Sequence, residues 1–280
     1  MFRIDRFVTA SPLPGFGLAL GVALLWLGLI VLLPLATLVV RTMEIGLSGV
    51  VSTAAQPRVL AALQTSFGLS LAAAVLNIFL GFTVAWVLSR YEFSGRRFLD
   101  AAVDLPFALP TAVAGIALSA LYGPSGWLGA PLAALGLKVA YTPLGIFIAL
   151  VFIGLPFMVR SIQPVLEVID AEIEEASATL GASRVSTVFR VVLPPLIPAA
   201  LTGFTLALAR AIGEYGSVIF VAGNIPYVSE IAPLLIVVKL DEFDYAGATA
   251  IACIMLAISF ILLLAINLLQ ASARRRLGHV

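Results

Sequence analysis

The sequence predicts an all-α integral membrane protein with six transmembrane helices and both termini in the cytoplasm. Of its 280 residues, 61% are hydrophobic and 11% are charged, whereas a soluble domain carries about 25% charged residues. The apolar residues gather in six segments that are long enough to cross a bilayer, which takes about 20 residues. The basic residues lie mostly on the loops of one side, and this bias sets the orientation.

Five of the six predicted spans contain no charged residue. The first span follows Arg3 and Arg6, but its 25 uncharged residues exceed the apolar core of about 7–15 residues in a signal peptide. We therefore expect it to be retained. Pro106 and Pro110 are expected to kink or delay the third span. The predicted spans are Phe16–Val40, Val59–Leu88, Leu105–Tyr122, Tyr141–Val159, Leu196–Ala222 and Tyr245–Leu269.

The orientation follows from counting Lys and Arg on the loops. With the N-terminus in the cytoplasm, eleven basic residues lie on the cytoplasmic side and four lie outside. This distribution satisfies the positive-inside rule. It also places segment 160–195, which holds five carboxylates, in the cytoplasm.

The longest charged interruption of the apolar pattern runs from Asp170 to Pro194. We expect a helical hairpin in which Asp170 caps the first helix and Gly181 makes a left-handed turn after it. Ser183 would cap the second helix, and Pro194 would end it. Apolar residues recur on one face of each helix. A hairpin of this kind on a membrane protein is either a lid or a docking surface.

The composition excludes several kinds of catalytic site. No G-x-x-x-x-G-K-[ST] phosphate loop is present, so the chain cannot bind and hydrolyse ATP in that way. Cys253 is the sole cysteine and His279 the sole histidine, which excludes an internal disulfide, a zinc site and a histidine-based triad. We expect no enzyme activity, no metal and no cofactor on this chain, and scattered basic residues give no sign of a nucleic-acid partner. Energy for transport must come from an ion gradient or from another subunit.

Two opposite charges lie inside the fifth predicted span. Arg210 and Glu214 are four residues apart, so they share a helix face near the bilayer centre and can form an ion pair. Each charge at that depth costs about 2.5–3.5 kcal/mol. The pair either fixes helix packing or lets Arg210 line an aqueous pathway and meet an anion, with Glu214 orienting it. Gly213 and Gly216 permit close helix approach or local unwinding.

The hairpin resembles a loop of known sequence pattern. Glu175-Ala176-Ser177, Gly181 and Leu193-Pro194 have the spacing of EAA-x3-G-x9-I-x-L-P, which marks the membrane subunits of bacterial ATP-binding-cassette (ABC) importers. Ser177 replaces the second alanine of the pattern, and Val191 replaces the isoleucine.

This resemblance implies a type I ABC importer permease fold within a single domain of residues 1–280, with a core at about 59–269 and a cytoplasmic coupling loop at 160–195. In that family the loop docks in a cleft of the ATPase subunit, which holds the ATP and Mg. The residues implied in docking are Glu175, Ala176, Ser177, Gly181, Leu193 and Pro194.

Four further stretches resemble the membrane subunits of sulfate/thiosulfate importers, and most of all the T (also called U) type. These are Leu105–Leu118, Ala209–Pro226, Ser229–Ile236 and Asp244–Ala252. Molybdate permeases share a similar ARAxGE-x-G stretch and AGNIP turn, so the segment after Pro226 is what favours sulfate.

The resemblance implies ATP-driven import of sulfate or thiosulfate across the bacterial inner membrane. The implied partners are a W-type permease subunit in a heterodimer, two ATP-binding subunits and a periplasmic sulfate/thiosulfate-binding protein. The alternatives are a permease subunit for molybdate or tungstate and a secondary anion carrier that needs no ATPase.

Overall fold

The computed structural model describes residues 15–276, apart from the side chains of residue 171 and residues 272–276. All regular structure in this range is helical, so the all-α prediction is confirmed. Arg3, Arg6 and His279 lie outside the described residues, and the cytoplasmic placement of the termini stays a prediction.

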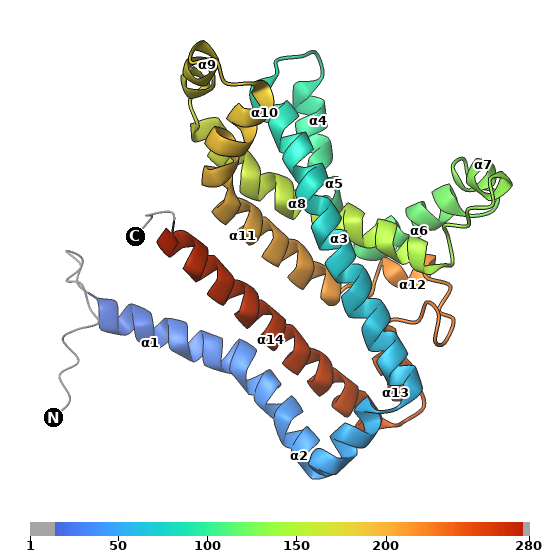
Figure 1. Cartoon of the computed structure of the whole chain (residues 1–280). Helices are drawn as coiled ribbons and strands as arrows, with labels where there is room; N and C mark the ends of the chain where they lie inside the picture. Colours follow the sequence, from blue (N-terminus) through green and yellow to red (C-terminus); the bar gives the residue numbers. More distant parts are fainter. Residues whose placement is uncertain (1–14, 277–280) are drawn as a thin grey trace.

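Five helices in the described range are long and apolar enough to cross a membrane (Figure 1). Two of them contain a π-helical turn, Gly28–Leu32 and Val188–Val192. The five are Phe16–Ala54 (α1, Phe16–Leu27, and α2, Leu33–Ala54), α3 (Pro57–Arg90), α8 (Pro143–Val168), Arg184–Ile212 (α10, Arg184–Thr187, and α11, Leu193–Ile212) and α14 (Tyr245–Arg276). The shorter helices are α4 (Arg96–Val103), α5 (Leu105–Ala108), α6 (Thr111–Tyr122), α7 (Gly129–Ala134), α9 (Ala171–Thr179), α12 (Val218–Val221) and α13 (Ala232–Asp241).

The third predicted span, Leu105–Tyr122, is not one continuous helix. Leu109 and Pro110 are extended, with ψ angles of 132° and 133°, and separate α5 from α6. The interruption follows from the prolines, as predicted. The 12 residues of α6 reach about 18 Å, which is less than the bilayer core of about 30 Å. Residues 15–276 therefore contain five helices of spanning length where the sequence predicts six.

The fifth predicted span, Leu196–Ala222, is wrong at both ends. The helix stops at Ile212, and residues 213–217 are non-helical before α12. At its other end, Pro194 does not end the second helix of the hairpin. The Leu193 N–H donates to the Val188 carbonyl five residues earlier, and this wider π turn lets the helix pass the proline without breaking.

The helix α3 is the centre of the packing, because buried clusters follow it from end to end. Near its start Val59 packs with Leu235 of α13, and near its end Leu88 packs with Met158 of α8. At the midpoint of its 34 residues, Ala73 shares a buried cluster with Ala211. The end of α11 therefore lies at the middle depth of the bundle.

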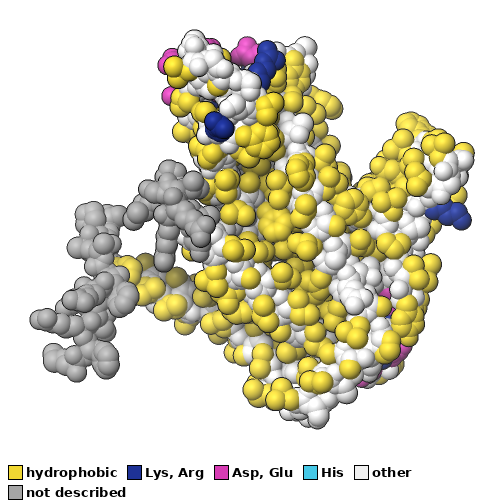
Figure 2. Space-filling view, viewed as in Figure 1, with side chains coloured by type: hydrophobic (Ala, Val, Ile, Leu, Met, Phe, Trp, Pro, Cys, Tyr) yellow, Lys and Arg dark blue, Asp and Glu magenta, His cyan; other side chains and the backbone are white. Residues whose placement is uncertain are grey.

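The outer surface of the bundle is apolar. No residue of α1 or α2 is buried, although eight of the 12 residues of α1 carry large hydrophobic side chains. Figure 2 shows hydrophobic side chains over most of the visible face, with charged ones at its top, where α9 lies in Figure 1, and a few at the right and lower right. We name the end that holds α9 the hairpin end. A surface of this composition requires lipid or another apolar partner.

The helix α6 covers the non-helical segment that follows α11. A Cβ atom on Gly115 would lie 2.8 Å from the Ser217 Cα atom, so the two backbones are in close contact. One turn further, the Ser119 hydroxyl donates to the Phe220 carbonyl over 2.6 Å. Non-helical backbone at membrane depth is tolerated where protein buries it, and α6 provides that cover.

We predict that Gly115→Ala lowers the amount of folded protein in the membrane, because the added methyl group collides with the Ser217 backbone. The expected cost is about 1–3 kcal/mol. Gly68→Ala in α3 is the matched control, since a Cβ at Gly68 meets nothing within 4 Å. Size-exclusion chromatography of a fluorescent fusion protein measures both variants. Equal folded yields for the two variants would contradict the packing described here.

Candidate functional site

The glycine turn of the hairpin has the predicted geometry. Gly181 has a φ of +85°, in the left-handed region that favours glycine. Its N–H donates to the Ala178 carbonyl over 2.9 Å, and the Ala182 N–H donates to the Ser177 carbonyl over 3.1 Å. This is a Schellman motif, which satisfies the carbonyls at the end of α9.

The two helices of the hairpin are joined by side chains. The Ser183 hydroxyl accepts from the Ser186 N–H over 3.3 Å, which confirms the predicted cap. The hydroxyls of Ser177 and Thr187 lie 2.9 Å apart and bond α9 to α10. Ser177, the departure from the alanine of the family pattern, thus holds the hairpin closed. Asp170 occupies the predicted cap position but makes no side-chain cap bond.

Arginines anchor the hairpin end to the bundle. Arg90, at the end of α3, pairs with Glu174 over 2.8 Å and donates to the Ile169 carbonyl over 2.9 Å. On α8, Arg160 pairs with Asp100 and Asp104 over 2.6 Å each, which fixes α4 and α5 in place. These contacts were not predicted from the sequence, although two aspartates four residues apart, Asp100 and Asp104, were a signal.

The outer face of the hairpin has no partner within the described chain. Glu175 is exposed and makes no ion pair there. Several of the apolar residues predicted to line the two helices are also exposed, with Leu180 at 88% and Val185 at 67%, whereas Val192 is buried. Apolar side chains gathered in this way mark an interaction site. We name Ile173, Glu175, Leu180 and Val185 the hairpin face.

One uninterrupted helix connects the hairpin to the middle of the bundle. It runs for 29 residues from Arg184 to Ile212, or about 43 Å. Leu193 and Pro194 of the loop pattern are half-buried at its π turn, where the hairpin becomes the span. Arg210 lies near the far end of the same helix.

Arg210 and Glu214 form the predicted ion pair. The Glu214 side chain is 2% exposed, while that of Arg210 is 34% exposed. The Glu214 carboxylate also accepts from the N–H and the hydroxyl of Ser217, both over 2.9 Å. The prediction that both charges share one helix face is wrong, because α11 ends at Ile212 and Glu214 lies in the turn beyond it.

The two glycines next to the pair play different parts. The predicted unwinding is confirmed, since residues 213–217 are non-helical. Gly216 makes a close approach, because a Cβ there would collide with the Thr111 side chain. A Cβ on Gly213 would meet nothing within 4 Å, so Gly213 is not a packing contact.

This geometry gives Arg210 the means to meet an anion. A guanidinium carries five N–H donors, and its exposed part can bind a second oxyanion beside the carboxylate. Because Glu214 already offsets the charge of Arg210, such binding would be weak. The described residues contain no group of three His, Cys, Asp or Glu side chains that could hold a metal.

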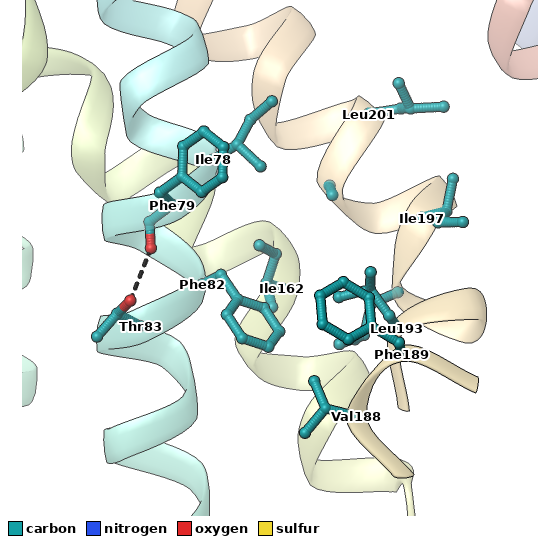
Figure 3. Close-up of a pocket in the computed structure, with 12 residues that line it drawn as sticks. Ile78, Phe79, Phe82, Thr83, Ile162, Val188, Phe189, Leu193, Ile197 and Leu201 are labelled. Atoms are coloured by element: carbon teal, nitrogen blue, oxygen red, sulfur yellow. Dashed lines mark hydrogen bonds between the residues drawn. The ribbon is translucent and has the colours of Figure 1, made fainter. Parts of the chain in front are cut away.

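A groove of about 420 Å³ lies between α3 and the segment from Val188 to Leu201, and Ile162 of α8 also lines it (Figure 3). Phe79 and Phe82 face Phe189 and Leu193 across it, and none of its lining residues is charged. The hydroxyl of Thr83 donates to the Phe79 carbonyl over 2.8 Å. The groove suits an apolar occupant, so we do not assign an anion site to it.

Another ion pair, between Arg58 and Glu230, joins two segments at the opposite end of the bundle. Arg58, at the start of α3, donates two hydrogen bonds of 2.8 Å and 2.7 Å to the carboxylate of Glu230. Glu230 is 2% exposed. No sequence pattern signals this pair, since 172 residues separate its members.

Comparison with solved structures agrees with this architecture. The chain superposes on a bacterial ABC transporter involved in the import of the acidic polysaccharide alginate with a TM-score of 0.74, over 91% of this chain and 94% of that one. A second structure, of the alginate transporter in complex with a pentasaccharide-bound periplasmic protein, gives 0.73 over 93% of both chains. Sequence identities are 16% and 17%, so the likeness concerns the fold.

Sequence comparison gives closer relatives. The chain is 47% identical over 268 residues to the sulfate transport system permease protein CysT of Escherichia coli, covering 95% of this chain and 97% of that protein. It is 48% identical over 260 residues to the probable sulfate transport system permease protein cysT of Nephroselmis olivacea, covering 93% and 92%.

Residues 77–277 match the family described as the inner membrane component of binding-protein-dependent transport systems. The matched region includes the hairpin, Arg210 and Glu214. The chain is therefore a multi-pass membrane permease and belongs to this family of inner membrane transport components.

Proposed function

We propose that this permease is the T-type subunit of an ATP-driven importer of sulfate or thiosulfate. The names of relatives at 47% and 48% identity support the anion. The observation that carries the mechanism is the single helix from Arg184 to Ile212, which joins an exposed docking surface to the Arg210 site.

The hairpin face is the docking surface for an ATP-binding subunit. Its exposed apolar side chains would enter a cleft of that subunit, and the unpaired Glu175 would meet a basic or N–H group there. The pair between Arg90 and Glu174 and the bond between Ser177 and Thr187 make the hairpin rigid. Closure of two ATP-binding subunits would then move it as a body.

The movement of the hairpin would reach the anion pathway because Arg210 lies on the helix that starts in the hairpin. Sulfate is a dianion, and the pair of Arg210 with Glu214 is neutral as a unit. A second permease subunit, the W-type partner, would complete the pathway from its own side. Sulfate would reach it from a periplasmic binding protein that docks at the end of the bundle formed by α13 and the start of α14. ATP and Mg belong to the ATP-binding subunits, and we assign no cofactor to this chain.

Purification in mild detergent and reconstitution into liposomes test the proposed function. We expect an ATP-binding subunit to co-purify and labelled sulfate to enter the liposomes only with ATP and the binding protein. Uptake that persists without ATP and follows an ion gradient would overturn the importer and support a secondary carrier.

Competition in the same assay tests the anion. Excess unlabelled sulfate or thiosulfate is expected to suppress the uptake of labelled sulfate, and molybdate or tungstate is expected to have little effect. Suppression by molybdate at lower concentrations than by sulfate would identify the chain as a molybdate permease subunit.

We predict that Arg210→Gln and Glu214→Gln combined restore folding but not transport. Arg210→Gln alone leaves a buried, unpaired carboxylate, which costs about 3–5 kcal/mol, so the protein should be lost from the membrane. The double variant removes that charge, and the amide that replaces the Glu214 carboxylate can still accept from Ser217. Its uptake of sulfate should be about 10–100-fold lower, since it lacks a charge-assisted bond to the anion.

Immunoblots of membranes and initial uptake rates separate the two effects. Glu214→Gln alone is the control for the shared substitution, because it keeps the Arg210 guanidinium. Wild-type uptake by the double variant would show that the ion pair only holds the helices together.

A further inference from the structure

A small cavity lies beside Glu214 in the middle of the bundle. Its volume is about 10 Å³, and every residue that lines it is buried. Most of the lining is apolar, but three members are polar: Ser66, Ser70 and Glu214. The lining residues are Ser66, Ser70, Ile146, Leu150, Ala211, Ile212, Glu214, Val218 and Ile231.

One polar group on this wall has no partner. Ser70 is 1% exposed, and its hydroxyl makes no hydrogen bond. A buried hydroxyl without a partner costs about 1–3 kcal/mol, so such groups are rare in native proteins. The other two polar groups have spare capacity. Ser66 accepts from the Ala232 N–H over 2.8 Å and can still donate.

We propose that this cavity is the binding site of a single water molecule held by Ser70, Ser66 and Glu214. A cavity of about 10–15 Å³ holds one water, which needs two to four polar partners. The water would accept from the Ser70 hydroxyl and donate to the Glu214 carboxylate, whose two oxygens have about four lone-pair sites. Its remaining bond would be with Ser66.

The chemistry of the wall selects water over a cation. The charge of Glu214 is already balanced by Arg210, so a bound cation would bring an uncompensated charge into the bilayer centre. Three polar side chains are also fewer than the six to eight oxygens that a Ca²⁺ ion takes. A neutral molecule with both donors and acceptors satisfies every group present.

The water would add a polar link between three parts of the bundle that already pack together at this depth. Ser66 and Ser70 belong to α3, Glu214 holds the turn after α11, and Ala232, whose N–H bonds to Ser66, begins α13. The water would thereby connect Glu214 to α3, the central helix of the bundle. The water would fix the position of the turn that presents Arg210.

A pair of serines on α3 tests the proposal. Ser89 also has a buried hydroxyl with no partner, but it does not line this cavity. With a water present, Ser70→Ala removes one of its partners, and the melting temperature of the purified permease complex should fall by about 2–4 °C. Ser89→Ala only removes an unpaired hydroxyl, so its melting temperature should equal or exceed that of the wild type.

A Ser70→Ala melting temperature equal to or above the wild-type value would overturn the proposal, because it is the result for an empty cavity. Density for the wild-type complex at about 2 Å resolution tests the site independently of any variant. One peak within about 3 Å of both the Ser70 hydroxyl and the Glu214 carboxylate is the expected result. An empty cavity at that resolution contradicts it.

Discussion

The rest of the structure depends on one constraint: backbone polar groups inside a bilayer must find partners within the protein. The chain breaks its helices between α5 and α6 and again after α11. The helix that follows the first break, α6, covers the second one, with Gly115 against Ser217 and Ser119 bonded to Phe220. The Glu214 carboxylate takes up the free N–H of Ser217. Glu214, which pairs with Arg210, therefore also satisfies a backbone N–H that the end of the helix leaves without a partner.

The same constraint explains how two prolines are accommodated without a break. A π turn directly precedes Leu33-Pro34 and another precedes Leu193-Pro194, and in each the leucine N–H reaches the carbonyl five residues earlier. The second case matters for function, since it keeps the hairpin and the Arg210 helix in one piece. A break at Pro194 would leave the docking surface free to move without moving the pathway. The proline of the loop pattern thus lies where the hydrogen bonding of the helix changes to a π turn but the helix itself continues. A continuous helix can pass a movement of the hairpin to Arg210.

Local sequence signals predicted most of the fold and of the hairpin. Apolar runs located four of the spans, and Gly181 and Ser183 fixed the turn, because each of these features depends on residues close in the chain. The error at Pro194 came from a local π turn, and the other errors came from packing between distant segments. The end of α11 at Ile212 depends on α6, and the bond of Arg58 to Glu230 joins residues that no periodicity relates. Arg210 and Glu214 could be paired from their spacing, but the turn that holds Glu214 could not be foreseen.

The central claim is that the helix from Arg184 to Ile212 moves as a rigid body. Spin labels at Arg184 and Leu206, both exposed, test it in the reconstituted complex after Cys253→Ser removes the native thiol. Their distance, about 33 Å along the helix, is measured by pulsed electron spin resonance without nucleotide and with bound ATP. The account predicts one narrow distribution that is the same in both states. A shift near the length of a helical turn, about 5 Å, would show that the helix bends at Pro194 and would contradict it.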